Sequence, residues 1–208
     1  MKSTRYKLVE FFIAFILTPI SFTLKFPLWI KMSIGGLGFV YVVFVLLRVE
    51  KNKFKISKTI NWKSFFNHTL IKLVLIAIIT TVFVWCTEAK NLFIVPLNKP
   101  ILWFFILFLY SVFSVYPQEL IYRTFYFQRY EVLFVNEKLF LFINAIVFSL
   151  AHLFFRNTIV LVFTFLGGLL FAITFKKTKS TLLVSIEHAI YGSWLFTVGM
   201  GEMLGFPT

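Results

Sequence analysis

Seven apolar runs, separated by short basic or polar segments, constrain this chain more than any other feature. A helix needs about 20 apolar residues to cross the hydrocarbon core of a bilayer, and these runs approach that length. The apolar residues are continuous rather than alternating, which favours helices over a transmembrane β-barrel. The sequence therefore predicts an all-α, polytopic transmembrane helical bundle with about seven spans, at residues 8–24, 27–47, 69–86, 101–116, 139–155, 159–175 and 181–200.

Composition supports the same conclusion. Hydrophobic residues make up 60% of the 208-residue chain, whereas apolar usage near half is typical of soluble domains. The length predicts a single membrane domain over residues 1–208. Within it, residues 1–98 supply the N-terminal spans, and residues 99–208 carry most of the polar side chains found inside spans. The first apolar run lacks a small-residue cleavage site, so we expect it to be retained as a span.

The net charge of +13 concentrates in the segments between the apolar runs, where it orients a membrane protein and meets anionic lipid head groups. The positive-inside rule places the N-terminus in the cytoplasm and, after seven crossings, the C-terminus outside. No aromatic-basic signature of RNA binding is present, so we expect no nucleic-acid partner. The basic residues that decide the orientation are Lys2, Arg5, Lys7, Arg48, Lys51, Lys53, Lys55, Lys58, Lys63, Arg123, Arg129, Lys138, Lys176, Lys177 and Lys179.

Ionisable residues inside spans are costly, so each of them is a candidate functional residue. Glu119 and Arg123 stand four residues apart and can meet on one helical face. Asn144, Phe148 and His152 follow the same spacing and predict a polar stripe on the fifth span, which Arg156 continues. The seventh span contains the adjacent pair Glu187 and His188, followed one turn later by Tyr191, Gly192 and Ser193.

Three interpretations of these residues remain open. A buried carboxylate with two imidazoles can activate water and stabilise an oxyanion. The same side chains can hold a divalent metal such as zinc. Alternatively, Glu119 with Arg123 is a structural ion pair, and His152 and His188 hydrogen-bond neighbouring helices. His68 and Cys86 lie near span ends, where we expect structural or interfacial roles.

Three short motifs give this pattern a family resemblance. Gln118-Glu119-x-x-x-Arg123, Phe148-x-x-x-His152 and the later His188 resemble, in order and spacing, those of the CAAX-protease and bacteriocin-processing family. That family includes bacterial abortive-infection proteins and type II CAAX prenyl proteases. The resemblance covers about residues 116–200. It implies an intramembrane endopeptidase in which Glu119 activates water, Arg123 fixes that carboxylate, and His152 and His188 stabilise the oxyanion. It leaves the cofactor open, either none or a divalent metal.

The chain departs from the family pattern at two positions. Gln118 stands where the family has the first glutamate of a pair, and an amide cannot act as a general base. Gly192 stands where the family has Asn or Asp, which removes a side chain near the oxyanion. Asn144 and Ser193 are the candidate replacements.

The sequence therefore supports two main hypotheses of function. The first is an intramembrane endopeptidase that cleaves a membrane-associated protein or peptide within the bilayer, in a prokaryotic inner membrane. The alternative is a catalytically impaired relative that acts as a membrane peptide-binding, scaffold or immunity protein. A small transporter ranks third, because neither inverted repeats nor paired broken helices are recognisable.

Overall fold

The computed structural model of the chain describes residue 1 and residues 3–52 and 60–205. Over these residues the secondary structure consists of helices, with no strand, which confirms the predicted all-α class. Lys2, Lys53, Lys55 and Lys58, which contribute to the predicted orientation, lie outside the described residues.

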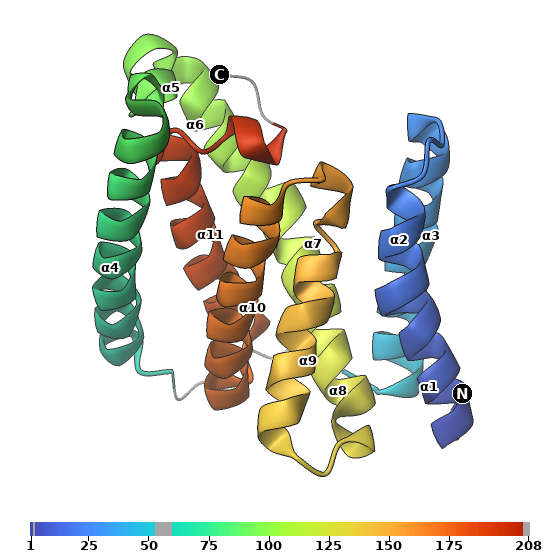
Figure 1. The fold of residues 1–208 in the computed structure, drawn as a ribbon. Helices are drawn as coiled ribbons and strands as arrows, with labels where there is room; N and C mark the ends of the chain where they lie inside the picture. The colour runs from blue at the N-terminus through green and yellow to red at the C-terminus, as the bar shows by residue number, and fades with distance from the viewer. Residues whose placement is uncertain (2, 53–59, 206–208) are drawn as a thin grey trace. The chain divides into compact units, whose positions relative to one another are not determined.

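Figure 1 shows the order of the helices along the chain. Contacts divide them into two compact units. The first unit comprises residues 1–56 and 117–179, and the second comprises residues 57–116 and 180–208. The α-helices are α1 (Thr4–Phe12), α2 (Thr18–Phe22), α3 (Leu28–Phe44), α4 (Trp62–Glu88), α5 (Ile94–Asn98), α6 (Pro100–Leu109), α7 (Tyr116–Glu119), α8 (Tyr126–Tyr130), α9 (Glu137–Leu150), α10 (Thr158–Thr178) and α11 (Thr181–Val198).

Short π-helical and 3₁₀ segments join or extend several of these helices. The π-helical segments are η1 (Ile13–Leu17), η2 (Val45–Val49), η4 (Tyr110–Val115) and η5 (Leu120–Phe125), and the 3₁₀ segments are η3 (Ala89–Asn91), η6 (Glu131–Leu133), η7 (Leu153–Phe155) and η8 (Glu202–Leu204). A π turn carries about one residue more than an α turn, so it changes the direction in which later side chains point.

Among the residues that the structure describes, five helical runs are long and apolar enough to cross a membrane, so the chain is a multi-pass membrane protein. They match five of the seven predicted spans. The other two predicted spans, residues 8–24 and 181–200, are also largely helical, in α1–η1–α2 and in α11. Seven crossings and a cytoplasmic N-terminus stay predictions. The five runs are Leu28–Val49, Trp62–Asn91, Pro100–Leu133, Glu137–Phe155 and Thr158–Thr178.

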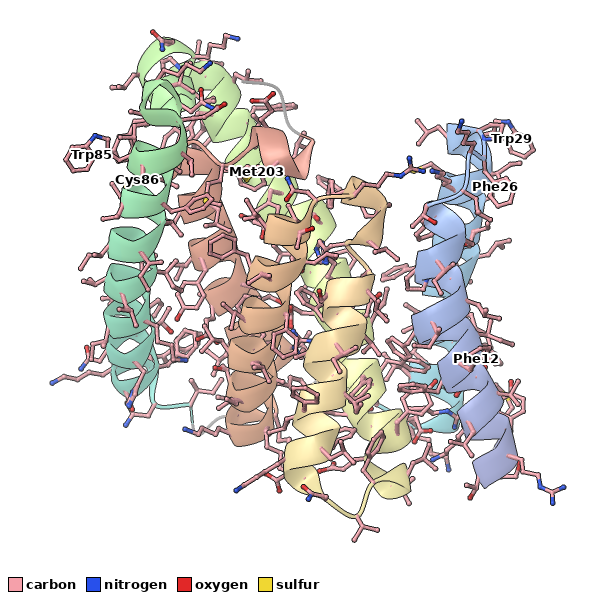
Figure 2. The ribbon with its side chains drawn as sticks, in the orientation of Figure 1. Phe12, Phe26, Trp29, Trp85, Cys86 and Met203 are labelled. Atoms are coloured by element: carbon pink, nitrogen blue, oxygen red, sulfur yellow. The ribbon has the colours of Figure 1, made fainter. Side chains whose placement is uncertain are left out.

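Large apolar side chains cover the outer faces of these helices. Phe12 is 52% exposed, Trp29 68% and Trp85 67%, and Figure 2 shows Trp29 and Trp85 projecting away from their helices. Cys86, beside Trp85, is also exposed. Lipid rather than water is the solvent in which such surfaces are stable, because a soluble protein rarely exposes large contiguous apolar patches.

Polar residues mark where the later helices begin. Asn136, Asn157 and Ser180 are the N-caps of α9, α10 and α11, and each accepts a hydrogen bond from a backbone N–H of the first turn. At the other end of α11, Gly199 has a φ of 110°. A Cβ there would lie 2.1 Å from the carbonyl oxygen of Asn91. Glycine is therefore required at this position, by both its backbone conformation and the available space.

An ion-pair cluster holds the first unit together at α8. The buried guanidinium of Arg129 lies 2.6 Å from Glu10 and 2.8 Å from Glu50. Tyr130 donates to Glu10 across 3.0 Å, and Tyr41 also bonds this carboxylate. The charge pattern of the sequence predicts only an orienting role for Arg129 at the lipid surface. The Arg129 side chain is fully buried and paired, so it does not face lipid head groups, and its orienting role stays a prediction.

Candidate active site

Glu119 lies at the end of α7, between two π-helical segments. Pro117 does not begin a new helix, because it lies within one helical run, Pro100–Leu133. Pro117 has no N–H to donate, and the π turn η4 immediately before it accommodates this loss without ending the helix. The run begins in the second unit and enters the first unit at Pro117. π turns often occur at functional sites. Here the π-helical segments η4 and η5 lie on either side of α7, which carries Glu119.

Glu119 and Arg123 form the predicted ion pair. Their Oε2 and Nε atoms are 3.3 Å apart, and both side chains are 0% exposed. A buried carboxylate is stable as an anion only if a positive charge and hydrogen bonds compensate its lost hydration. Arg123 provides that charge. Gln118, the preceding residue, is half-buried on the same helix.

Asn144 of α9 positions Arg123. Its Oδ1 accepts a hydrogen bond from Arg123 Nη1 at 2.9 Å, and its Nδ2 donates to the carbonyl of Tyr122 at 2.7 Å. Arg123 also donates to the carbonyls of Tyr122 and of Gly168 on α10. Both ends of the Asn144 amide are therefore engaged in holding Arg123. That Asn144 replaces the side chain missing at Gly192 stays a prediction.

Phe148 links Arg123 to His152. Its ring lies against the guanidinium, 4.6 Å from the Arg123 Cζ to the ring centroid. Its carbonyl lies 2.9 Å from His152 Nδ1. A carbonyl oxygen can only accept, so this contact assigns a proton to Nδ1, and in the neutral ring the lone pair is on Nε2. The Phe-x-x-x-His spacing thus defines a physical contact and not merely a shared helical face.

The predicted stripe on the fifth span is interrupted. The helix α9 ends at Leu150, and His152 lies in the turn before η7. Arg156 has a φ of 53° and donates to the carbonyl of Thr23 across 2.8 Å. Arg156 is therefore a structural residue of the turn rather than a continuation of the stripe.

His188 lies on α11 in the second unit and is buried. The ring of Tyr110, in η4, packs edge-on against it, with ring centroids 6.0 Å apart at an interplanar angle of 80°. Gly192 follows His188 by one turn. A Cβ on Gly192 would lie 1.8 Å from the Tyr110 hydroxyl oxygen and 2.4 Å from Cζ. The Tyr110 side chain therefore occupies the space that a side chain at position 192 would need.

Glu187 has a different environment from its neighbour His188. Its Oε1 lies 2.7 Å from Lys72 Nζ and accepts a hydrogen bond from Tyr191 at 2.9 Å. The Tyr191 hydroxyl also contacts the carbonyl of Thr69. These contacts join α11 to α4, so Glu187 and Tyr191 stabilise the second unit. The backbone carbonyl of Ser193 accepts from Thr197 within α11.

The two units divide the predicted site residues between them. Gln118, Glu119, Arg123, Asn144, Phe148 and His152 belong to the first unit, whereas Glu187, His188, Gly192 and Ser193 belong to the second. In the described part of the chain, no group of three or more His, Cys, Asp or Glu side chains could hold a metal ion.

Tyr110 is absent from the residues that the sequence singles out. Its hydroxyl lies in an otherwise apolar run, 78 positions before His188 in the chain, so no helical spacing relates the two residues. The only local signal is the polar pair Tyr110-Ser111 within that apolar run.

One comparison with known protein families gives a match. A family model described as type II CAAX prenyl endopeptidase Rce1-like matches residues 100–194. The matched segment contains all three motifs, from Gln118 to His188, and extends through Gly192. It confirms the family resemblance predicted from those motifs over this part of the chain. No curated protein matches the chain, and no solved structure does.

Proposed function

From the family match over residues 100–194, we infer that this chain is an intramembrane endopeptidase, which hydrolyses a peptide bond of a membrane-associated protein or peptide. The observation that carries this proposal is the buried pair Glu119 and Arg123 at the first motif. A carboxylate without exposure to solvent costs stability. Its presence at the motif position of a protease family supports a catalytic role.

Glu119 is the general base in this proposal. Water attacks the carbonyl carbon of the scissile bond and transfers a proton to the Glu119 carboxylate. The tetrahedral intermediate then collapses, the C–N bond breaks, and Glu119 returns the proton to the leaving amine. Gln118 cannot take this part because a neutral amide is not a proton acceptor at neutral pH. Arg123, 3.3 Å away, fixes the orientation of the Glu119 carboxylate.

His152 and His188 stabilise the oxyanion that forms on the carbonyl oxygen. The Nδ1 of His152 donates to Phe148, so the ring can donate from Nε2 only when it is also protonated there. His152 is therefore proposed to act as an imidazolium. A positive donor aimed at a developing negative charge is among the largest contributions to catalysis.

The test is cleavage of quenched peptides by the purified protein in lipid nanodiscs. Two peptides are tested to distinguish two classes of substrate. One is a prenylated peptide with a C-terminal CAAX sequence, and the other is an unmodified transmembrane peptide. We expect Glu119→Gln to abolish cleavage while the protein stays folded. Glu88→Gln, which changes an exposed carboxylate in the second unit, is the matched control and should retain activity. Equal cleavage by wild type and Glu119→Gln would refute the assignment.

A second candidate function is peptide binding without efficient cleavage. Gln118 and Gly192, which replace the family's glutamate and its Asn or Asp, favour it. It predicts a wild type that binds the peptide but does not cleave it, and a Gln118→Glu variant that gains cleavage. Loss of peptide binding in His152→Ala would support it further.

A further inference from the structure

The hydroxyl of Tyr110 lies where the side chain of residue 192 would begin. A Cβ on Gly192 would meet Tyr110 Oη at 1.8 Å, Cζ at 2.4 Å and Cε1 at 2.5 Å. Atoms this close cannot coexist, so the tyrosine occupies this position because residue 192 is glycine. Within the second unit, the Tyr110 side chain thus fills the space that the glycine at position 192 leaves empty.

This position is next to His188. Residues 188 and 192 stand four apart on α11, so their side-chain directions share one face of the helix. The Tyr110 ring packs edge-on against both His188 and Phe196, with centroid distances of 6.0 and 4.8 Å. Two ring contacts on the same side chain restrict its rotation. The hydroxyl is therefore held at a defined point on the His188 face of α11.

We propose that Tyr110 is a further catalytic residue, whose phenol donates a hydrogen bond to the oxyanion beside His188. This inference rests on the proposed protease function. A phenol is neutral and keeps its proton near neutral pH, since its ordinary pKa is about 10. It can therefore donate to a developing negative charge without first gaining or losing a proton. Gly192 is then the residue that makes room for this donor, and not simply a lost side chain.

A purely structural role and a catalytic role for Tyr110 predict different results for the variant Tyr110→Phe. If the tyrosine only fills the space beside Gly192, its ring is what matters, and Tyr110→Phe should be silent. If the hydroxyl acts on the oxyanion, removing it should lower kcat and leave KM nearly unchanged, because the contact forms mainly in the transition state.

The first experiment compares Tyr110→Phe with Tyr116→Phe, a control at an exposed tyrosine of the same helical run. We expect kcat to fall about 100-fold in Tyr110→Phe, the usual loss on removing one oxyanion donor. Thermal stability should stay that of the wild type, and Tyr116→Phe should cleave normally. A kcat within about twofold of wild type in Tyr110→Phe, with Glu119→Gln inactive, would overturn this inference and leave the proposed function standing.

The second experiment moves the hydrogen-bond donor from residue 110 to residue 192. Gly192→Asn alone should lower thermal stability, because the Tyr110 ring must leave its place. The double variant Tyr110→Ala with Gly192→Asn puts an amide donor in the vacated space. It should be more stable than Gly192→Asn and more active than Tyr110→Ala. A stable double variant no more active than Tyr110→Ala would overturn the inference. A wild type that cleaves neither substrate would refute the proposed function itself, and this inference with it.

Discussion

Arg123 donates from Nη1 to Asn144 Oδ1 across 2.9 Å, and both side chains are fully buried. This hydrogen bond crosses from η5 to α9, so it ties the first motif of the chain to the helix that carries Phe148 of the second motif. The orientation of Arg123, and through it that of Glu119, depends on a residue that contributes no charge.

Replacing Asn144 should therefore disturb the first unit. In Asn144→Leu, a buried guanidinium loses an acceptor and the Tyr122 carbonyl loses a donor, which should cost about 2–3 kcal/mol. Thermal unfolding of the protein in nanodiscs measures this loss. Asn144→Asp keeps the acceptor for Arg123 and should lose less. An Asn144→Leu protein as stable as wild type would contradict the proposed positioning role.

Lys72 should be required for stability but not for chemistry. Lys72→Met leaves Glu187 buried without its cation, and breaking such a pair typically costs about 3–5 kcal/mol. Lys72 is partly exposed, with 32% of its side chain accessible, so we expect the lower part of that range or less. The measurement is again thermal unfolding. The double variant Lys72→Met with Glu187→Gln removes both charges and should recover most of the loss.

The same double variant separates Glu187 from the reaction. Its cleavage rate per folded molecule should equal that of wild type, because the Glu187 carboxylate is held by Lys72 and Tyr191 as a structural link between α4 and α11. A kcat reduced more than about tenfold in a stable double variant would assign Glu187 a catalytic role.

His152 should contribute to the rate of cleavage. If its Nε2 donates to the oxyanion, His152→Gln should lower kcat and leave KM nearly unchanged, because the contact forms mainly in the transition state. Steady-state kinetics in nanodiscs measure both constants. A kcat of His152→Gln equal to that of wild type would contradict this role.

Arg129 should be essential for folding of the first unit. In Arg129→Met the carboxylates of Glu10 and Glu50 lose a shared cation, which should destabilise the unit by about 3–5 kcal/mol. Limited proteolysis in nanodiscs would detect the loosened α1 and α8 segments. Arg156→Met, which removes an exposed-turn contact to Thr23, serves as the control and should be milder. Equal resistance in both variants would contradict the importance of this cluster.

Patterns that act over one helical turn could be predicted from the sequence. Glu119 with Arg123, and Phe148 with His152, are local pairs, and the structure brings each pair into contact. Five of the seven predicted spans were equally predictable, because a bilayer demands long apolar helices whatever their packing. The cation that compensates Glu119 was thus identifiable from the four-residue spacing alone.

Contacts between distant segments could not be predicted in this way. Arg129 and Glu10 are separated by 119 positions, and neither sequence neighbourhood indicates the other. The same holds for Lys72 with Glu187 and for Tyr110 with Gly192. A glycine at position 192 looked like a missing group because the sequence does not reveal which side chain fills the space.

The π-helical segment η5 (Leu120–Phe125) sets the angular phase between two polar clusters of the first unit. Glu119 precedes it, and Arg129 follows it. Wound as an ordinary α-helix, the same six residues would turn everything beyond them by about 100°. The helix could then keep Glu119 in its place, or Arg129 on Glu10, but not both. Deleting one residue from this segment, for example Thr124, removes the extra residue of the π turn, so the helix can close with the α period and still direct Arg129 at Glu10. The chain should accordingly accept the loss of one residue here more readily than in an ordinary α-helical segment.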